Sequence, residues 1–274
     1  MGSKLFYVAS AGLLLASPAL GASLSPLHIH DENGQLGTVD VATGDVVDIG
    51  DLGVQLTDIA FAPDGDLFGI SVSTLFRVDP ETAATTEVGT HGIAGANALV
   101  FDSDGRLFAA GVGGTELFEI DTATAESQVI GDTGFESAGD LAFNGGSLFL
   151  SSTQDTLVEI DVVSGEGLEV GAFGFSGVLG LATGGDGTLF GLSGTNVFSV
   201  DTATGQGTQV VNFAGQGFSQ SFGSSFIDEA VTVDLVIPTP PAPSTPSGVV
   251  PSPAALPAGL MLLAAVAGRR KREA

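Results

Sequence analysis

Apolar and polar side chains alternate through most of the middle of this chain. Phe76 and Val78 share one side of a short segment, with Arg77 on the other side. The same alternation recurs at Phe118–Ile120, Val158–Ile160 and Phe198–Val200. Because successive side chains of a strand point to opposite faces, a period of two predicts β-strands. Nothing between residues 23 and 237 has helical spacing with caps, so we expect an all-β domain there.

A longer period near 40 residues is superimposed on this alternation. One landmark, Leu-x-x-Val/Ile-Asp (Val at the first position in the last copy), ends at aspartates spaced 39, 42, 40 and 40 residues apart: Asp40, Asp79, Asp121, Asp161 and Asp201. A second landmark is an apolar strand, a Gly-rich turn and Leu-Phe, found at Ile59–Phe68, Leu99–Phe108, Leu141–Phe149 and Leu181–Phe190. Glycine in these turns supplies the positive φ that tight hairpins need.

Each repeat contains four short strands. In the second repeat they are Asp58–Phe61, Leu67–Ser71, Leu75–Asp79 and Thr85–Gly89. Four strands in about 40 residues form the blade of a β-propeller, whereas the coils of a β-helix, the competing architecture, have a shorter period. The strand-Asp-turn and Pro-Asp-Gly elements resemble those of the YVTN and related surface propellers, a resemblance of architecture and not of a site.

The two ends of the repeat domain predict how the ring closes. Leu27–His30 aligns with Leu67–Ile70, the second strand of a blade, so the chain enters the pattern without a first strand. Further strand material follows the fifth landmark, within Phe218–Phe226 or Ala230–Val236. We therefore predict a propeller of five four-stranded blades in which this C-terminal segment completes the first blade. Closure hides the sheet edges. A sixth, partial blade is the alternative.

Residues 1–22 have the three regions of a secretory signal peptide. Lys4 is the basic start, Leu5–Leu20 is apolar, and Gly21 or Ala22 offers a small residue for cleavage. An N-terminal membrane anchor is the alternative, but no longer apolar stretch follows.

The repeat domain, residues 23–237, is followed by a proline-rich linker, residues 238–253, that holds seven of the twelve prolines. Proline has no backbone donor, so we expect this stretch to be extended chain. Residues 254–274 contain an apolar run to Gly268 and then a basic cluster. Fifteen residues are short for a bilayer core of about 30 Å, but snorkelling and local thinning compensate. The basic end should stay cytoplasmic, which places the repeat domain outside.

The C-terminal motif is Val250-Pro251-Ser252-Pro253-Ala254-Ala255-Leu256-Pro257. Together with the apolar run and the terminal bases, it resembles a PEP-CTERM-type sorting tail in its VPLPA variant. Ser252 stands in place of that pattern's Leu, and Pro253-Ala254 stands where others carry Glu-Pro. The resemblance assigns the sorting signal to Val250, Pro251, Pro253, Ala254, Arg269, Arg270, Lys271 and Arg272.

The resemblance of this tail to a sorting signal implies a cellular localisation. The resemblance implies a Gram-negative bacterium, passage through the export machinery, and an inner-membrane-anchored stage through the C-terminal segment. It further implies processing by an exosortase-like protease and delivery to the cell surface or the extracellular medium. A plain C-terminal tail anchor, retained and not cleaved, is the alternative.

The charge is concentrated in the repeat domain. Residues 23–248 hold 31 acidic residues against Arg77 and Arg106, a formal charge of −29. Such a domain repels nucleic acid, since binding to phosphates requires Lys and Arg, and it also repels anionic membranes. A solvated acidic shell and attraction of divalent cations both fit this acidity.

Metal ligands have three candidate locations. His28 and His30 lie two apart and should face the same side of a strand, with Asp31 and Glu32 following. The other two resemble calcium loops in their spacing, at Asp64 and Asp66 and at Asp102 and Asp104. Neither loop has the bidentate Glu of a full calcium site, so hairpin turns are the simpler interpretation. We expect no cofactor and keep calcium as the alternative.

No catalytic constellation stands out. The chain has no Cys, three His and no Gly-x-Ser-x-Gly elbow between strand and helix. Paired carboxylates remain open among so many acids, although the mature domain has no Trp or Tyr to form a sugar platform.

We therefore expect a non-enzymatic surface or matrix protein that binds an unknown surface protein or polymer through its propeller loops. The alternative is a lactonase-like hydrolase or lyase with a metal in the central channel. Polar residues converging on that channel would favour the enzyme. The nearest ones to the predicted innermost strands are Asn97, Asn144, Asp58 and Asp140.

Overall fold

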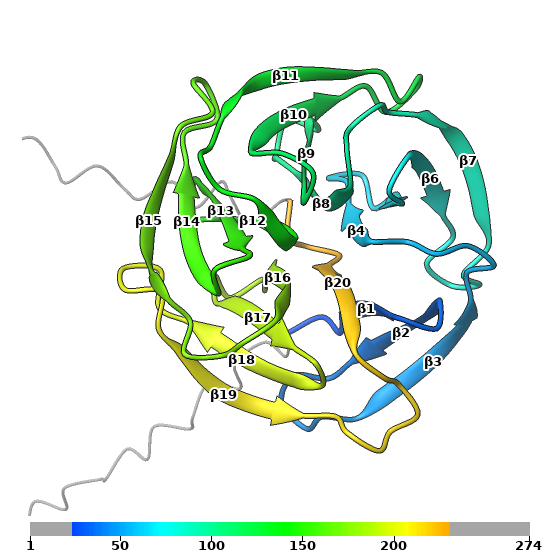
Figure 1. Ribbon diagram of the computed structural model, residues 1–274. Coiled ribbons are helices and arrows are strands. Elements are labelled where there is room, and N and C mark those ends of the chain that lie inside the picture. Colours follow the sequence, from blue (N-terminus) through cyan, green and yellow to red (C-terminus); the bar gives the residue numbers. More distant parts are fainter. Residues whose placement is uncertain (1–23, 231–274) are drawn as a thin grey trace, which may run out of the picture. The chain divides into compact units, whose positions relative to one another are not determined.

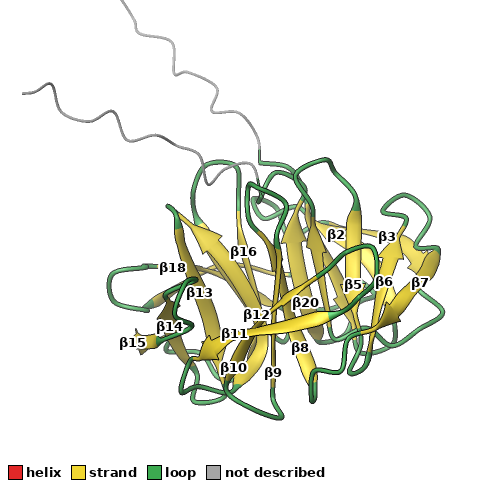
Figure 2. Ribbon diagram, turned by 90° about the horizontal axis from the view of Figure 1, so that it is seen from above, coloured by secondary structure: helices red, strands yellow, loops and turns green. Residues whose placement is uncertain are grey.

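The computed structural model describes residues 24–230, and every regular element in that range is a β-strand. Five antiparallel four-stranded sheets stand around one axis as the blades of a propeller (Figure 1). Seen from the side, the strands run between two ends of the ring where the loops gather (Figure 2). No helix in this part of the chain is long and apolar enough to cross a membrane.

The strands are given from the axis outwards. Blade 1 contains β20 (Ser221–Phe226), β1 (Leu27–Asp31), β2 (Gln35–Val39) and β3 (Val46–Asp51). Blade 2 contains β4 (Asp58–Phe61), β5 (Leu67–Ile70), β6 (Thr74–Val78) and β7 (Thr85–Thr90). Blade 3 contains β8 (Ala96–Phe101), β9 (Leu107–Gly111), β10 (Glu116–Ile120) and β11 (Ser127–Asp132). Blade 4 contains β12 (Ser137–Asn144), β13 (Ser147–Ser152), β14 (Thr156–Ile160) and β15 (Gly167–Ala172). Blade 5 contains β16 (Val178–Thr183), β17 (Leu189–Ser193), β18 (Asn196–Val200) and β19 (Gly207–Asn212).

Blade 1 closes the ring by pairing the two ends of the repeat domain. β20 runs antiparallel to β1, with Leu27 opposite Phe226 and His30 opposite Gly223. The prediction of five blades and of closure by a C-terminal segment is confirmed, and the strand lies within Phe218–Phe226 as expected. The other candidate segment, Ala230–Val236, lies almost wholly outside the described residues. No sixth blade is present between residues 24 and 230.

The core lies between the blades. The alternating apolar side chains of one blade pack against those of the next, as Phe108 does against Phe143 and Phe190 against Phe226. Phe198, predicted to share a face with Val200, is fully buried against Phe173 and Phe175. Each blade has two apolar faces and shields neither alone, so neighbouring blades are required for stability.

The aspartate of the first landmark ends each third strand and begins a turn. In four of the five turns, Oδ1 accepts two backbone N–H groups; in blade 3 they come from Ala123 and Thr124, at 2.8 and 2.9 Å from Asp121. The predicted strand at Leu75–Asp79 therefore stops one residue earlier, at Val78, because the Asp79 carboxylate caps the turn.

Candidate functional site

The innermost strands β4, β8, β12, β16 and β20 surround the axis of the propeller (Figure 1). Their registers align one position in every blade. It is occupied by Asp58, Ala98, Asp140, Gly180 and Gly223. Asp58 and Asp140, predicted from the repeat to be equivalent, are thus brought together from alternate blades. We call Asp58, Asp140 and Glu229 the axial carboxyls.

Both axial aspartates join neighbouring blades. Asp58 accepts the N–H of Ile59 in its own strand at 2.7 Å and that of Leu99, in blade 3, at 2.6 Å. Asp140 does the same with Leu141 and with Leu181 of blade 5, at 2.7 Å each. Inner strands of a propeller do not pair with each other, so these carboxyls satisfy backbone donors that would otherwise be buried and unpaired.

Glu229, just after β20, provides the third axial carboxyl. Its Oε1 accepts the N–H of Thr183 in blade 5 at 3.0 Å, and its Oε2 accepts the hydroxyl of Ser225 at 2.9 Å. Ser225 in turn accepts the N–H of Phe61 in blade 2 at 3.2 Å, and Ser224 donates to Asp140 at 3.3 Å. The strand that closes the ring is therefore bonded to blades 2, 4 and 5.

Burial shifts the titration of all three axial carboxyls in the same direction. Burial raises the pKa of Asp58 and of Asp140 well above the usual range, and the two carboxyls lie within hydrogen-bonding reach of each other. Burial also raises the pKa of Glu229, to about 8. Because burial disfavours the charged form, each of these carboxyls holds its proton to a higher pH in the folded protein than in the unfolded chain.

Of the two predicted histidine ligands, His30 lies beside Asp58, where both side chains approach the backbone of Gly223. His28 packs edge-on against Phe61, with ring centroids 4.8 Å apart, and His30 is fully buried under Phe222. Burial lowers the pKa of each ring to about 4, so both are neutral at physiological pH. In the described part of the chain neither nitrogen of His30 has a hydrogen-bond partner.

The backbone at Gly223 passes so close to these groups that no side chain fits. A Cβ there would lie 2.7 Å from Cα of Asp58 and 2.8 Å from Nε2 of His30. Within residues 24–230, no group of three or more His, Cys, Asp or Glu side chains is arranged to hold a metal ion.

The two predicted asparagines complete the connections between blades. Asn97 donates from β8 to the Ser137 carbonyl in blade 4 at 3.2 Å. Asn144 donates to the Gly187 carbonyl in blade 5 at 2.8 Å. Polar residues therefore do converge on the axis, as the enzyme alternative requires. However, each one that is bonded holds two inner strands together.

The two candidate calcium loops form hairpin turns. Asp64 accepts the N–H of Asp66, whose own carboxylate pairs with Arg77. Asp102 accepts the N–H groups of Asp104 and Arg106, at 3.0 and 2.8 Å. Asp31, next to the histidines, accepts the N–H groups of Asn33 and Gln35.

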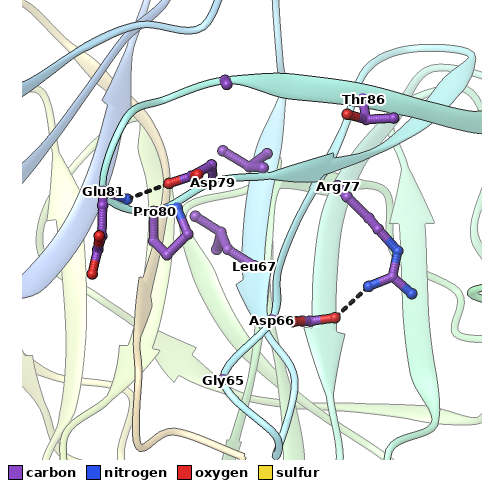
Figure 3. A pocket seen from close by; sticks show the side chains of 10 residues that line it. Gly65, Asp66, Leu67, Arg77, Asp79, Pro80, Glu81 and Thr86 are labelled. Carbon is purple, nitrogen blue, oxygen red and sulfur yellow. Dashed lines mark hydrogen bonds and ion pairs between the residues drawn. The ribbon is translucent and has the colours of Figure 1, made fainter.

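Shallow grooves recur on the outside of the ring. They lie at the end of the ring that carries the turn after the first strand and the turn after the third strand of each blade. Figure 3 shows the one in blade 2, of about 540 Å³, where Asp66 pairs with Arg77 and Asp79 caps its turn. A groove of about 570 Å³ lies at the equivalent place in blade 4, beside Asp161 and Glu166. We call this the turn end of the ring.

Comparisons with known proteins support the fold. No protein-family model matches the sequence, and no curated protein matches it. A protein of unknown function from Bacteroides thetaiotaomicron VPI-5482 superposes with a TM-score of 0.54 at 15% identity, over 77% of this chain and 63% of that chain. A chain of a nidogen/laminin complex superposes with a TM-score of 0.50 at 10% identity, over 74% and 84%. The chain is a five-bladed β-propeller, and similarity at these identities concerns the fold alone.

Sequence reasoning missed Glu229. It lies outside the repeat, so no period pointed to it, and only its position directly after the closing strand distinguishes it. Ser224 and Ser225 were missed for a related reason, because the last segment is the most degenerate copy of the pattern.

Proposed function

We propose that this chain is an exported, non-enzymatic propeller that binds a surface protein or a matrix polymer through the loops at one end of the ring. The supporting observation is the state of the axial aspartates. Asp58 and Asp140 have no exposed surface, and both oxygens of each accept backbone N–H groups. They support the ring, and they are not presented to a ligand.

The alternative is a hydrolase or lyase that uses the polar axis, and the convergence of carboxyls beside His30 favours it. A general acid or base must come within hydrogen-bonding reach of its substrate. Asp58, Asp140 and His30 are all 0% exposed. An enzyme would need to open the inner strands that these residues hold together.

The turn end is the more suitable surface for binding. Blades 1, 3 and 4 carry an acidic side chain at the same place in the turn before the fourth strand: Asp45, Glu126 and Glu166. All three are exposed, and none of their carboxylates takes part in capping its own turn. Side chains repeated around a rigid ring suit a partner that is itself extended or repetitive.

The proposed address depends on segments outside the described residues. The signal peptide of residues 1–22, with cleavage at Gly21 or Ala22, and the sorting tail from Val250 to Arg272 both lie there. Deleting residues 250–274 should release the domain into the medium, measured by immunoblotting of cell and medium fractions. Equal retention on the cells would contradict the sorting proposal.

The loop proposal is tested in the full chain by the triple substitution Asp45→Lys, Glu126→Lys and Glu166→Lys. After export and processing, this variant should be washed from the surface fraction at a salt concentration that retains the wild type. Its melting temperature should stay close to that of the wild type, because the substituted side chains are exposed.

The matched control reverses three charges at the opposite end, through Glu32→Lys, Glu116→Lys and Glu136→Lys. It should be retained as well as the wild type. If both triple variants were lost equally from the surface fraction, the effect would be due to net charge and not to the turn end. If both were retained, the turn end would not be the binding surface.

Chelation separates the two candidate functions. The scaffold predicts that EDTA shifts the melting temperature only slightly and leaves surface retention unchanged, since carboxylates at the turns are already bonded to backbone N–H groups. A large fall in melting temperature on chelation would show that a divalent cation, calcium foremost, is part of the native protein and would revive the metal-dependent alternative.

A further inference from the structure

In blades 2 to 5, the residue before the Leu-Phe pair of the second strand lies at the turn end, near one residue of the third strand. In blade 2 these two residues are Asp66 and Arg77, which form an ion pair (Figure 3). In blade 3 the charges are exchanged, and Arg106 pairs with Glu119 at 2.6 Å. The registers of β5 with β6 and of β9 with β10 place both ion pairs at the same point of the repeat.

Both of these arginines also lie over an aromatic ring. The guanidinium carbon of Arg77 is 4.6 Å from the centre of the Phe68 ring, and that of Arg106 is 4.7 Å from the centre of the Phe108 ring. A guanidinium group is attracted by a carboxylate and by the face of a ring. Blades 2 and 3 therefore each contain a site for a guanidinium group, and each fills it with an arginine of its own.

Blade 4 has the acid of this site without the arginine. Glu159 takes the position of Glu119 and lies opposite Phe149, while Ser147 takes the position of Arg106. The Ser147 hydroxyl donates to the Glu159 carboxylate. Residues 24–230 contain two arginines and no lysine, and both arginines are paired in blades 2 and 3. Within the described residues, the Glu159 carboxylate therefore has a hydroxyl partner but no cation.

The groove of blade 4 adds apolar surface beside this carboxylate. It has a volume of about 570 Å³, and Val163 and Leu168 line it together with Glu159. Val163 is 85% exposed and Leu168 is 70% exposed. Leu168 lies directly opposite Glu159 in the sheet, so the two side chains share one face. The equivalent residues in the groove of blade 2 are polar, Glu81 and Thr86.

We propose that the groove of blade 4 binds an arginine side chain of a partner polypeptide, with an apolar residue next to that arginine packed against Leu168 and Val163. This inference rests on the proposed function, in which the turn end binds a partner, and it names the chemistry that the partner presents. An exposed ion pair contributes little to affinity by itself, so burial of the two apolar side chains supplies part of it. The negative charge of the repeat domain attracts a basic partner and so favours the encounter.

Ser147→Arg in the full chain is the direct test. It places an arginine where blade 3 has Arg106, so the new side chain should pair with Glu159 and fill the groove from within. Thr188→Arg is the matched control, because it adds the same charge at the equivalent place in blade 5, where Ser199 replaces Glu159. Ser147→Arg should be washed from the surface fraction at a lower salt concentration than the wild type and the control.

The outcomes separate this inference from the proposed function. Equal retention of Ser147→Arg and the control would overturn the groove as a binding site, and so would equal loss of both. If the triple lysine variant of the turn end were lost while Ser147→Arg was retained, the turn end would remain the binding surface without this groove. If the triple lysine variant were retained as well, the proposed function would fall with the inference.

A peptide titration tests the chemistry of the groove directly. The probe is acetyl-Leu-Arg-Leu amide, and the control peptide carries citrulline, which has the shape of arginine without its charge. The arginine peptide should shift the amide NMR signals of β14 and β15 in the isotope-labelled full chain, and should bind about two- to fivefold more tightly than the control. Equal binding of the two peptides would overturn the proposal. Binding that strengthens on deletion of residues 250–274 would also overturn it, because the basic cluster of the chain itself would then be the occupant.

Discussion

The landmark aspartates show how a motif can arise from one local need. Each ends a third strand, and its carboxylate accepts N–H groups from the turn that follows. These hydrogen bonds lower the pKa of Asp79, Asp121 and Asp161. The sequence predicted where these turns lie. The sequence alone could not show whether these aspartates cap turns or bind a cation, because the residue type is the same in both cases.

Close packing between blades also fixes single residues. Gly89 in the outer strand of blade 2 lies against the turn of blade 3, where a Cβ would be 2.8 Å from the Thr124 carbonyl oxygen and 3.3 Å from Cβ of Ala125. Gly50, Gly131 and Gly171 occupy the same place in blades 1, 3 and 4. The recurrence of glycine at this place in the repeat follows from the contact.

Gly89→Ala should therefore destabilise the protein by about 1–3 kcal/mol, the usual cost of overpacking. Thr86→Ala, exposed on the same strand, should change stability by less than about 0.5 kcal/mol. Chemical denaturation of both variants measures the difference. Equal stability of Gly89→Ala and wild type would mean that the two blades are farther apart than described.

The buried histidines set the acid limit of stability. Their pKa values are lowered to about 4 in the folded protein, so the unfolded chain binds protons first as pH falls below the ordinary value of 6.5. Stability should therefore fall between pH 6.5 and 4, by up to about 3 kcal/mol for each ring. His30→Gln should reduce the proton uptake on unfolding at pH 5 by about one, measured from the pH dependence of the unfolding free energy. An unchanged slope would show that His30 is not buried in the native state.

At the scale of the strand, the sequence predicted number, order and approximate bounds, but not register. All five outer strands contain a β-bulge at the same position, filled by Ile49, Val88, Ile130, Val170 and Val210. The alternation of apolar residues does not predict a bulge, because one inserted residue only shifts the alternation by one position along the strand. A bulge twists an edge strand away from regular pairing and so discourages aggregation.

The charged residues beside the bulges should serve the same purpose. Leu168 in β15 is 70% exposed, and Glu169 separates it from the bulged Val170. Glu169→Val would leave a continuous apolar edge, so it should increase concentration-dependent aggregation at nearly unchanged melting temperature. Glu81→Val, which removes the same charge from a turn, is the control. Light scattering that rises equally in both variants would assign the effect to net charge instead.

The five-bladed ring was predictable from the sequence repeat, but the hydrogen bonds between side chains at its axis were not. Aspartates 39 to 42 residues apart and a missing first strand were enough to infer five blades and their closure. The bonding at the axis depends on side chains from blades distant in sequence and on Glu229, which belongs to no repeat. The enzyme alternative could not be judged from sequence for the same reason, since exposure of Asp58 and Asp140 is a property of the closed ring.

Closure by β20 is the claim on which both the fold and the scaffold proposal depend. The most direct measurement compares thermal unfolding of a chain ending after Ala230 with that of a chain ending after Gln220, both starting at Leu24. The longer chain should unfold in one cooperative transition, and the shorter one should lose that transition, because blade 1 would lack its innermost strand and the axis its third carboxyl. A shorter chain that unfolds as cooperatively, and at the same temperature, would contradict the account.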